Sequence, residues 1–149
     1  MKIFDVRYGV LADPNGFKVE VIEDSSASKI VLNVVNLENS IEFYTTILGM
    51  TLFRKRSNVN SLPKHASICA KVGYTDEKDV ESSILELNYN YATEKLNHGV
   101  GFDGLTLKIK DMDSMKAKLT TEKIDTVVSE SGALVIEDPN GYKISLLPM

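Results

Sequence analysis

The chain has 149 residues, of which 43% are apolar, and a formal net charge of −4 at pH 7. One globular domain with a core is expected, because a chain of this size buries roughly 68–70% of its unfolded surface. The acidic balance and the mixing of charges along the sequence argue against a nucleic-acid-binding protein. No apolar run approaches membrane-spanning length, so we predict a cytoplasmic protein with no membrane partner.

Residues 2–22 are predicted to form a β-hairpin. The segment Asp13-Pro14-Asn15-Gly16 strongly favours a β-turn, and it lies between two stretches that alternate in polarity. Further along, Asn36 is expected to cap a helix that ends at Gly49, because the apolar residues between them fall at helical spacing.

Three strands are predicted after this helix, and the second half of the chain repeats the order of strand, helix and strands. In that half, Asp111 or Asp113 is expected to cap a short helix that carries Met112, Met115 and Leu119 on one side. The predicted strands are 29–35, 51–56, 65–72, 84–91, 104–110 and 125–128, and a last hairpin is predicted over 133–147.

The two hairpins form an internal repeat, LADPNGFKVEVIED near the N-terminus and IEDPNGYKISLLPM at the end. The expected fold class is therefore α+β, with paired βαβββ modules forming curled, mainly antiparallel sheets and an extra N-terminal β-hairpin. We predict that residues 1–23 form a hairpin like the end of an upstream module. Residues 29–149 are predicted to form one domain, with modules at 29–91 and 104–149.

The stretch ILELNYNY (84–91) places a carboxylate and two amides on one strand face. Glu86, Asn88 and Asn90 share that face, whereas Tyr89 and Tyr91 are predicted to lie in the core. Polar groups are costly to bury unless they are paired, so this face is expected to line a cleft.

Two other features are assigned ordinary structural roles. Arg54-Lys55-Arg56 is interpreted as the solvated end of a strand rather than as a binding patch. The single cysteine, Cys69, lies in an alternating apolar segment and is predicted to be a buried thiol.

Three stretches of the chain resemble one known family. They are VLNVVNLENSIEFYTTILGMTLFRKR (31–56), ILELNYNYATEKLNHGVGF (84–102) and EDPNGYKISLL (137–147). In order, spacing and residue class they are similar to glyoxalase I (lactoylglutathione lyase), in the vicinal oxygen chelate superfamily. The resemblance implies a divalent Ni or Zn ion held by two carboxylates and two His or Gln side chains. The metal polarises the methylglyoxal–glutathione hemithioacetal, and a ligating carboxylate moves the proton.

Carrying the family's metal site over to this chain keeps only one ligand. The four positions fall on Lys29, Glu86, Gly104 and Ser145. An ammonium has no lone pair and repels a metal cation, and glycine offers no side chain. By the hairpin alignment, Glu20 takes the place of the final-strand carboxylate, so Glu86 and Glu20 are the candidate catalytic and metal-binding residues. We hypothesise that Lys29 replaces the metal cation.

The resemblance also implies a glutathione site, of which part is kept. Asn90 matches the family's asparagine, and Asn33 falls where an arginine is expected, so both are candidate substrate-binding residues. The position of a further basic residue in the family falls near Val100, which is uncharged, and a long loop of the family is shortened to 129–132. Each missing cation removes a charge-assisted anchor worth roughly 1.5–3 kcal/mol.

Two functions follow from this comparison. The first is a glyoxalase I-like protein with a degenerate metal site, acting as a small-molecule-binding or non-catalytic module with no cofactor. The alternative is an active lactoylglutathione lyase whose Zn or Ni site is rebuilt from Glu20, Glu86 and His98. In both, the expected partners are a small-molecule ligand such as a glutathione conjugate and a second copy of the chain, because exposed sheet edges favour a homodimer.

Overall fold

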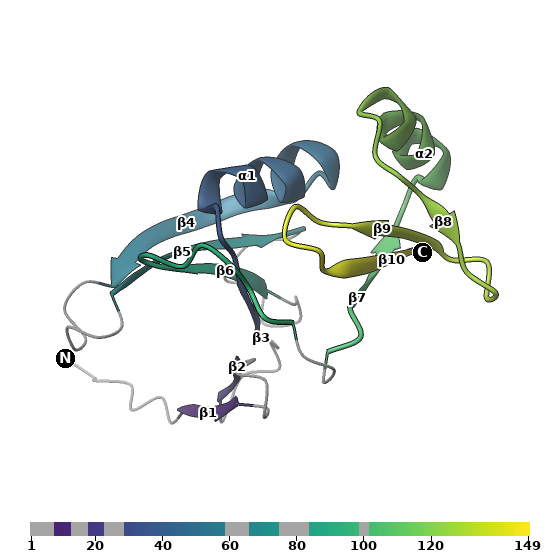
Figure 1. Cartoon of the computed structure of the whole chain (residues 1–149). Helices are drawn as coiled ribbons and strands as arrows, with labels where there is room; N and C mark the ends of the chain where they lie inside the picture. The colour runs from purple at the N-terminus through teal and green to yellow at the C-terminus, as the bar shows by residue number, and fades with distance from the viewer. Residues whose placement is uncertain (1–7, 13–17, 23–28, 59–65, 75–83, 99–101) are drawn as a thin grey trace, which may run out of the picture.

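The chain forms two open sheets, and each has one helix against one face (Figure 1). The computed structural model describes residues 8–12, 18–22, 29–58, 66–74, 84–98 and 102–149. The first sheet contains β1 (Tyr8–Ala12), β2 (Lys18–Ile22), β3 (Lys29–Asn33), β4 (Thr51–Asn58), β5 (Ser67–Gly73) and β6 (Ile84–Asn90). The second contains β7 (Leu105–Ile109), β8 (Val127–Val128), β9 (Leu134–Glu137) and β10 (Lys143–Pro148).

Both sheets have the same internal plan. Their strand orders are β1-β2-β3-β6-β5-β4 and β7-β10-β9-β8. The first strand of each module runs parallel to the last one, β3 beside β6 and β7 beside β10, and the other pairs are antiparallel. This arrangement confirms the predicted α+β class with paired βαβββ modules. The division into a hairpin and a single domain stays a prediction.

The extra N-terminal hairpin extends the first sheet. β1 and β2 pair antiparallel, and β2 pairs antiparallel with β3. Figure 1 shows the sheet curling so that this hairpin lies on the side away from the first helix. The two hairpins also share a register, because Ala12 faces Lys18 as Glu137 faces Lys143. The predicted turn at 13–16 lies outside the described residues.

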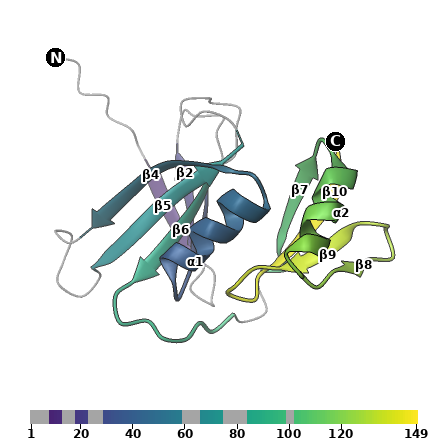
Figure 2. The same cartoon turned by 90° about the horizontal axis from the view of Figure 1, so that it is seen from above.

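The first helix packs against β5 and β6 (Figure 2). It begins as α1 (Leu37–Glu42), and the predicted cap is confirmed, because Asn36 Oδ1 accepts from the N–H of Asn39 at 3.1 Å. It continues as a π-helical turn, Phe43–Ile47, which the sequence pattern did not indicate. The Thr45 hydroxyl donates to the Ile41 carbonyl at 2.7 Å, which in an α-helix is the acceptor for the Thr45 N–H.

The second helix, α2 (Met112–Thr121), resolves the choice between two caps. Asp111 Oδ1 accepts from the N–H of Ser114 at 2.9 Å, so Asp111 is the cap. Leu119 is buried, and Met112 and Met115 pack against the core as predicted. Neither of the described helices is long and apolar enough to cross a membrane.

Several predicted details differ in the structure. The strand expected at 125–128 is reduced to β8, and β4 extends to Asn58. Tyr91 was predicted to be core but is 48% exposed, because it follows the last residue of β6 and lies in a turn. Tyr89 is partly buried against the core. The predicted strand start at His65 and most of the charged loop before β6 lie outside the described residues.

A buried polar network joins the two modules. Tyr44 is fully buried, and its hydroxyl donates to Asp138 Oδ2 at 3.0 Å. Asp138 also accepts from the backbone N–H groups of Asn140 and Tyr142, at 2.8 and 2.9 Å. The Asn140 side chain then reaches the first helix, donating to Ser40 Oγ at 3.0 Å. The turn residues of β9–β10 therefore hold the first helix in place.

Burial is the main cause that raises the pKa of Tyr44 well above its ordinary value, and the negative charge of Asp138 raises it further. The same two causes, in the same order, raise the pKa of Tyr142 to about 12. Burial alone raises the pKa of Tyr74 to about 12. All three hydroxyls are thus protonated donors at neutral pH.

Tyr44→Phe is expected to lower the free energy of unfolding by about 1.5–3 kcal/mol, because the lost bond has a charged acceptor. Tyr74→Phe is the matched control. Its hydroxyl donates to the neutral carbonyl of Leu48 at 2.8 Å, so the expected cost is about 0.5–1.5 kcal/mol. Urea denaturation of both variants measures the difference, and an equal loss contradicts the role assigned to Asp138.

Stability is expected to fall in alkali. A tyrosine whose pKa is higher in the folded state binds more protons folded than unfolded between the two pKa values. The contribution of Tyr74 and Tyr142 is therefore intact below about pH 10 and is lost as the pH rises toward about 12. Denaturation at a series of pH values measures this loss, and a stability that stays constant up to pH 12 would show the expectation to be wrong.

Candidate functional site

The face of the first sheet opposite α1 carries a group of polar side chains. The predicted alternation of β6 is observed, because Leu85 and Leu87 are buried on the helix side. Glu86, Asn88 and Asn90 point to the opposite side and are partly buried. We call this surface the open face, defined by those three residues and by the residues of β3, β4 and β5 that the strand register places on the same side of the sheet.

An ion pair lies at one end of the open face. Lys29 Nζ donates to Glu86 Oε2 at 3.1 Å, and each side chain is only 12% exposed. In β2, Glu20 is the backbone partner of Lys29. The structure therefore places the backbone of Glu20 beside that of Lys29, the residue that is ion-paired with Glu86. The catalytic and metal-binding roles of Glu20 and Glu86 stay predictions.

Three amides lie next to this ion pair. Asn88 Nδ2 donates to Asn33 Oδ1 and to Asn90 Oδ1, both at 3.2 Å. Asn90 Nδ2 also donates to Asn33 Oδ1, at 3.5 Å. The two predicted substrate-binding residues, Asn33 and Asn90, are thus brought together. Asn88 is the third member of this cluster. The sequence indicated only that Asn88 lies on the same strand face as Glu86 and Asn90.

The second module fixes the position of Asn33. The Tyr142 hydroxyl donates to the Asn33 carbonyl at 2.9 Å. The Tyr142 ring is packed edge-to-face against His98, with ring centres 4.8 Å apart, and against Phe102 at 5.9 Å. His98 therefore packs on Tyr142, at the junction between the modules.

The structure shows the surroundings of Lys29, Gly104 and Ser145, which the resemblance places at metal-ligand positions of the family. At Gly104, φ is +137°, and an added Cβ would lie 2.4 Å from the backbone oxygen of Lys143. Any side chain at this position is blocked by the backbone. Ser145 lies in β10 between Thr106 and Val135, and Lys29 supplies an ammonium instead of a lone pair. In the part of the chain that the structure describes, no three His, Cys, Asp or Glu side chains gather closely enough to hold a metal.

The open face also carries cations that the sequence interpretation did not connect with the site. Arg54 and Arg56 are exposed, which confirms that this segment is solvated. However, Arg54 pairs in register with Lys71, and Lys71 pairs with Glu86. The alternation of β4 placed the two arginines on one face, but only the register shows that this face is the one with Glu86. Cys69 is buried as predicted.

A groove lies between the two modules beside the start of β6. It has a volume of about 540 Å³, and its lining includes Ile84, Leu85, Gly104 and Leu105. Ile84 is the register partner of Lys29. Most of the first-sheet lining faces the helix-covered side, because Ile30 and Val72 are the register partners of Leu85.

Gly104→Ala is expected to lower the free energy of unfolding by more than about 1 kcal/mol, because the new methyl group meets the Lys143 carbonyl in a strained backbone. Gly132→Ala is the matched control. Gly132 also has a positive φ, +83°, but an added Cβ meets nothing within 4 Å. Thermal or urea denaturation compares the two, and equal losses contradict the backbone block at Gly104.

Comparison with known proteins gives a consistent result. The profile of the Glyoxalase/Bleomycin resistance protein/Dioxygenase superfamily matches residues 27–146. A probable lactoylglutathione lyase of Synechocystis is 35% identical over 125 residues, which cover 78% of this chain and 90% of that protein. The lactoylglutathione lyase of Neisseria meningitidis is 33% identical, with 78% and 86% covered.

Solved structures agree with these matches. The trypanothione-dependent glyoxalase I of Leishmania major has a TM-score of 0.68 and 30% identity, covering 80% of this chain and 84% of that one.

Proposed function

The chain belongs to the Glyoxalase/Bleomycin resistance protein/Dioxygenase superfamily, and on that premise we propose that it is a glyoxalase I-like small-molecule-binding protein that works without a metal ion. The observation that carries this proposal is the contact of 3.1 Å between the Lys29 ammonium and the Glu86 carboxylate. Glu86 is the one carboxylate kept from the family's ligand set, and the positive charge beside it is supplied by Lys29 of the same chain.

The chemistry of this pair supports binding rather than catalysis. A metal ion at Glu86 would lie close to an ammonium, and like charges in a partly buried place repel strongly. The proposed protein therefore keeps the polar sheet face of the family, with an ammonium in place of the metal ion beside Glu86.

One observation supports a second function, which also remains a proposal. The relatives named above are lactoylglutathione lyases, and the backbone of Glu20 lies beside Lys29, where a rebuilt site would need it. In that case the ligand is the methylglyoxal–glutathione hemithioacetal, and Glu86 and Glu20 bind Zn or Ni. A glutathione conjugate as ligand, with contacts to Asn33 and Asn90, is compatible with both functions. The homodimer and the cytoplasmic location also remain proposals.

The test is metal analysis of the purified protein, followed by an assay of hemithioacetal isomerisation with Ni, Zn and Co each added back. We expect no stoichiometric metal and no turnover above the reaction without protein. The Neisseria meningitidis enzyme is the positive control for the assay. Metal-dependent turnover that Glu86→Ala abolishes would overturn the proposal and establish the second function.

A further inference from the structure

We propose that a cleft between the end of the first helix and α2 binds a small alkyl carboxylate, with Lys110 and Lys118 at its charged end. The cleft has a volume of about 380 Å³, and we call it the interhelix cleft. The residues that line it in the described part of the chain include none of the open face. The inference therefore goes beyond the proposed function, because it assigns a second ligand site.

The walls of the interhelix cleft are apolar and come from both modules. Ile47 and Leu48 are buried at the end of the first helix, and Ile109 is the buried last residue of β7. Tyr74 and Met149 also line the cleft, and they are 46% and 74% exposed. Exposed apolar side chains in a concave site are typical of ligand-binding surfaces. The apolar part of a ligand therefore has surface to cover here.

The size of the interhelix cleft limits the ligand. Ligand pockets span roughly 300–1,000 Å³, so a cleft of about 380 Å³ is near the lower end of that range. The hydroxyl of Tyr74 already donates to the Leu48 carbonyl at 2.8 Å, so it does not donate to a polar ligand. A short alkyl chain fits these walls better than a polar ring or a peptide.

The helix α2 brings charged and apolar groups to the same side of the interhelix cleft. Asp111, Ser114, Met115 and Lys118 all line it, and their spacing of three and four residues places them on one helix face. Asp111 Oδ1 accepts from the Ser114 N–H at 2.9 Å, so this carboxylate is engaged as the helix cap. Lys110 directly precedes that cap. An ammonium group therefore lies on each side of the apolar Met115 along the chain.

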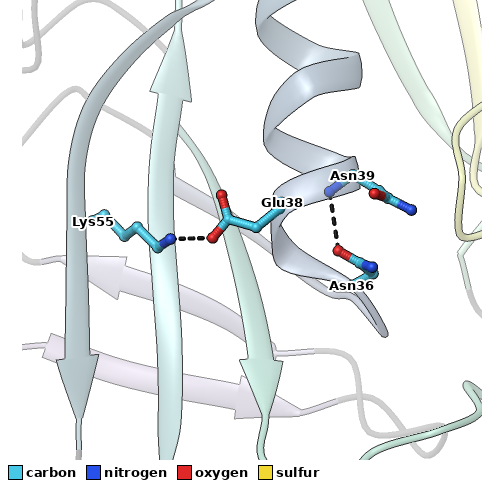
Figure 3. A network of polar contacts seen from close by, with 4 residues as sticks. All are labelled: Asn36, Glu38, Asn39 and Lys55. Atoms are coloured by element: carbon cyan, nitrogen blue, oxygen red, sulfur yellow. Dashed lines mark hydrogen bonds and ion pairs between the residues drawn. The ribbon is translucent and has the colours of Figure 1, made fainter.

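The charge of the interhelix cleft favours an anion with a single charge. Three lysines line it, Lys108, Lys110 and Lys118. Lys55, by contrast, is ion-paired with Glu38 on the first helix (Figure 3). Among the residues that the structure describes, no ion pair is found for the three cleft lysines. Even with Asp111 and the α-carboxylate of Met149 counted against them, positive charge is in excess. A carboxylate matches this small excess better than a phosphate monoester, which carries about two charges.

The experiment is calorimetric titration of the full chain with octanoate, butyrate and octan-1-ol. We expect octanoate to bind and butyrate to bind at least tenfold more weakly, because each buried methylene strengthens binding by about fourfold. Octan-1-ol has the same alkyl chain without the charge, and we expect it to bind about tenfold more weakly than octanoate. No binding of octanoate, or equal binding of all three compounds, would overturn the inference.

The lysines are tested with the double variant Lys110→Ala/Lys118→Ala. We expect it to weaken octanoate binding by about tenfold, because two ion pairs with the carboxylate are lost. Lys116→Ala is the matched control. Lys116 is exposed on the same helix, two residues from Lys118, and it does not line the interhelix cleft. Its loss is expected to change binding by less than about twofold, and circular dichroism verifies that both variants are folded. An equal effect of the two variants contradicts the role of the lysines.

Methionine methyl signals locate the ligand. Met115 and Met149 line the interhelix cleft, whereas Met112 does not. In protein labelled with ¹³C at the methionine methyls, we expect octanoate to shift the signals of Met115 and Met149 more than that of Met112, with Met115→Leu and Met149→Leu providing the assignments. Octanoate that binds without shifting the Met115 signal occupies another site and refutes the inference. Metal-dependent turnover would refute the proposed function alone, because the two sites share no lining residue.

Discussion

The arrangement of the whole molecule depends on one buried carboxylate. Asp138 accepts four hydrogen bonds, two from backbone N–H groups of its own turn, one from Asn140 Nδ2 and one from the Tyr44 hydroxyl of the first helix. A buried charge without such partners is costly, so the turn and the helix are stable only together. The same turn supplies Tyr142, whose hydroxyl holds the Asn33 carbonyl. A hairpin from the second sheet therefore holds the end of β3 that carries Asn33.

The sequence predicted the features that local physical chemistry determines. The helix caps at Asn36 and Asp111, the alternation in β6 and the D-P-N-G turn at 138–141 each depend on neighbours in sequence. The π-helical turn at Phe43–Ile47 was not predicted, because the apolar residues of this segment have the spacing of an ordinary α-helix. The exposure of Tyr91 was also missed, because alternation alone does not show at which residue the strand ends and side chains stop packing against the core.

The candidate site was predictable only in part. Comparison of motifs found Glu86, Asn33 and Asn90 and indicated that Lys29 occupies a ligand position, and the structure shows the contacts that they make. The contribution of β4 and β5 was missed, because three strands must be aligned before Arg54 and Lys71 are known to lie beside Glu86. Likewise, Gly104 was seen as the loss of a ligand, whereas its contact with Lys143 is visible only after folding.

The extra hairpin makes the two halves of an internally repeated chain unequal. β3 and β7 are equivalent strands, yet β2 already pairs with β3, while β7 has one neighbour among the described strands. The hairpin therefore changes the edge of the first sheet, because β1 is the outer strand there and β3, the counterpart of β7, lies in the interior. The edge strands among those described are β1 and β4 in the first sheet and β7 and β8 in the second. An unpaired strand edge can pair with another chain, so the two halves of the repeat present different backbone edges for such a contact.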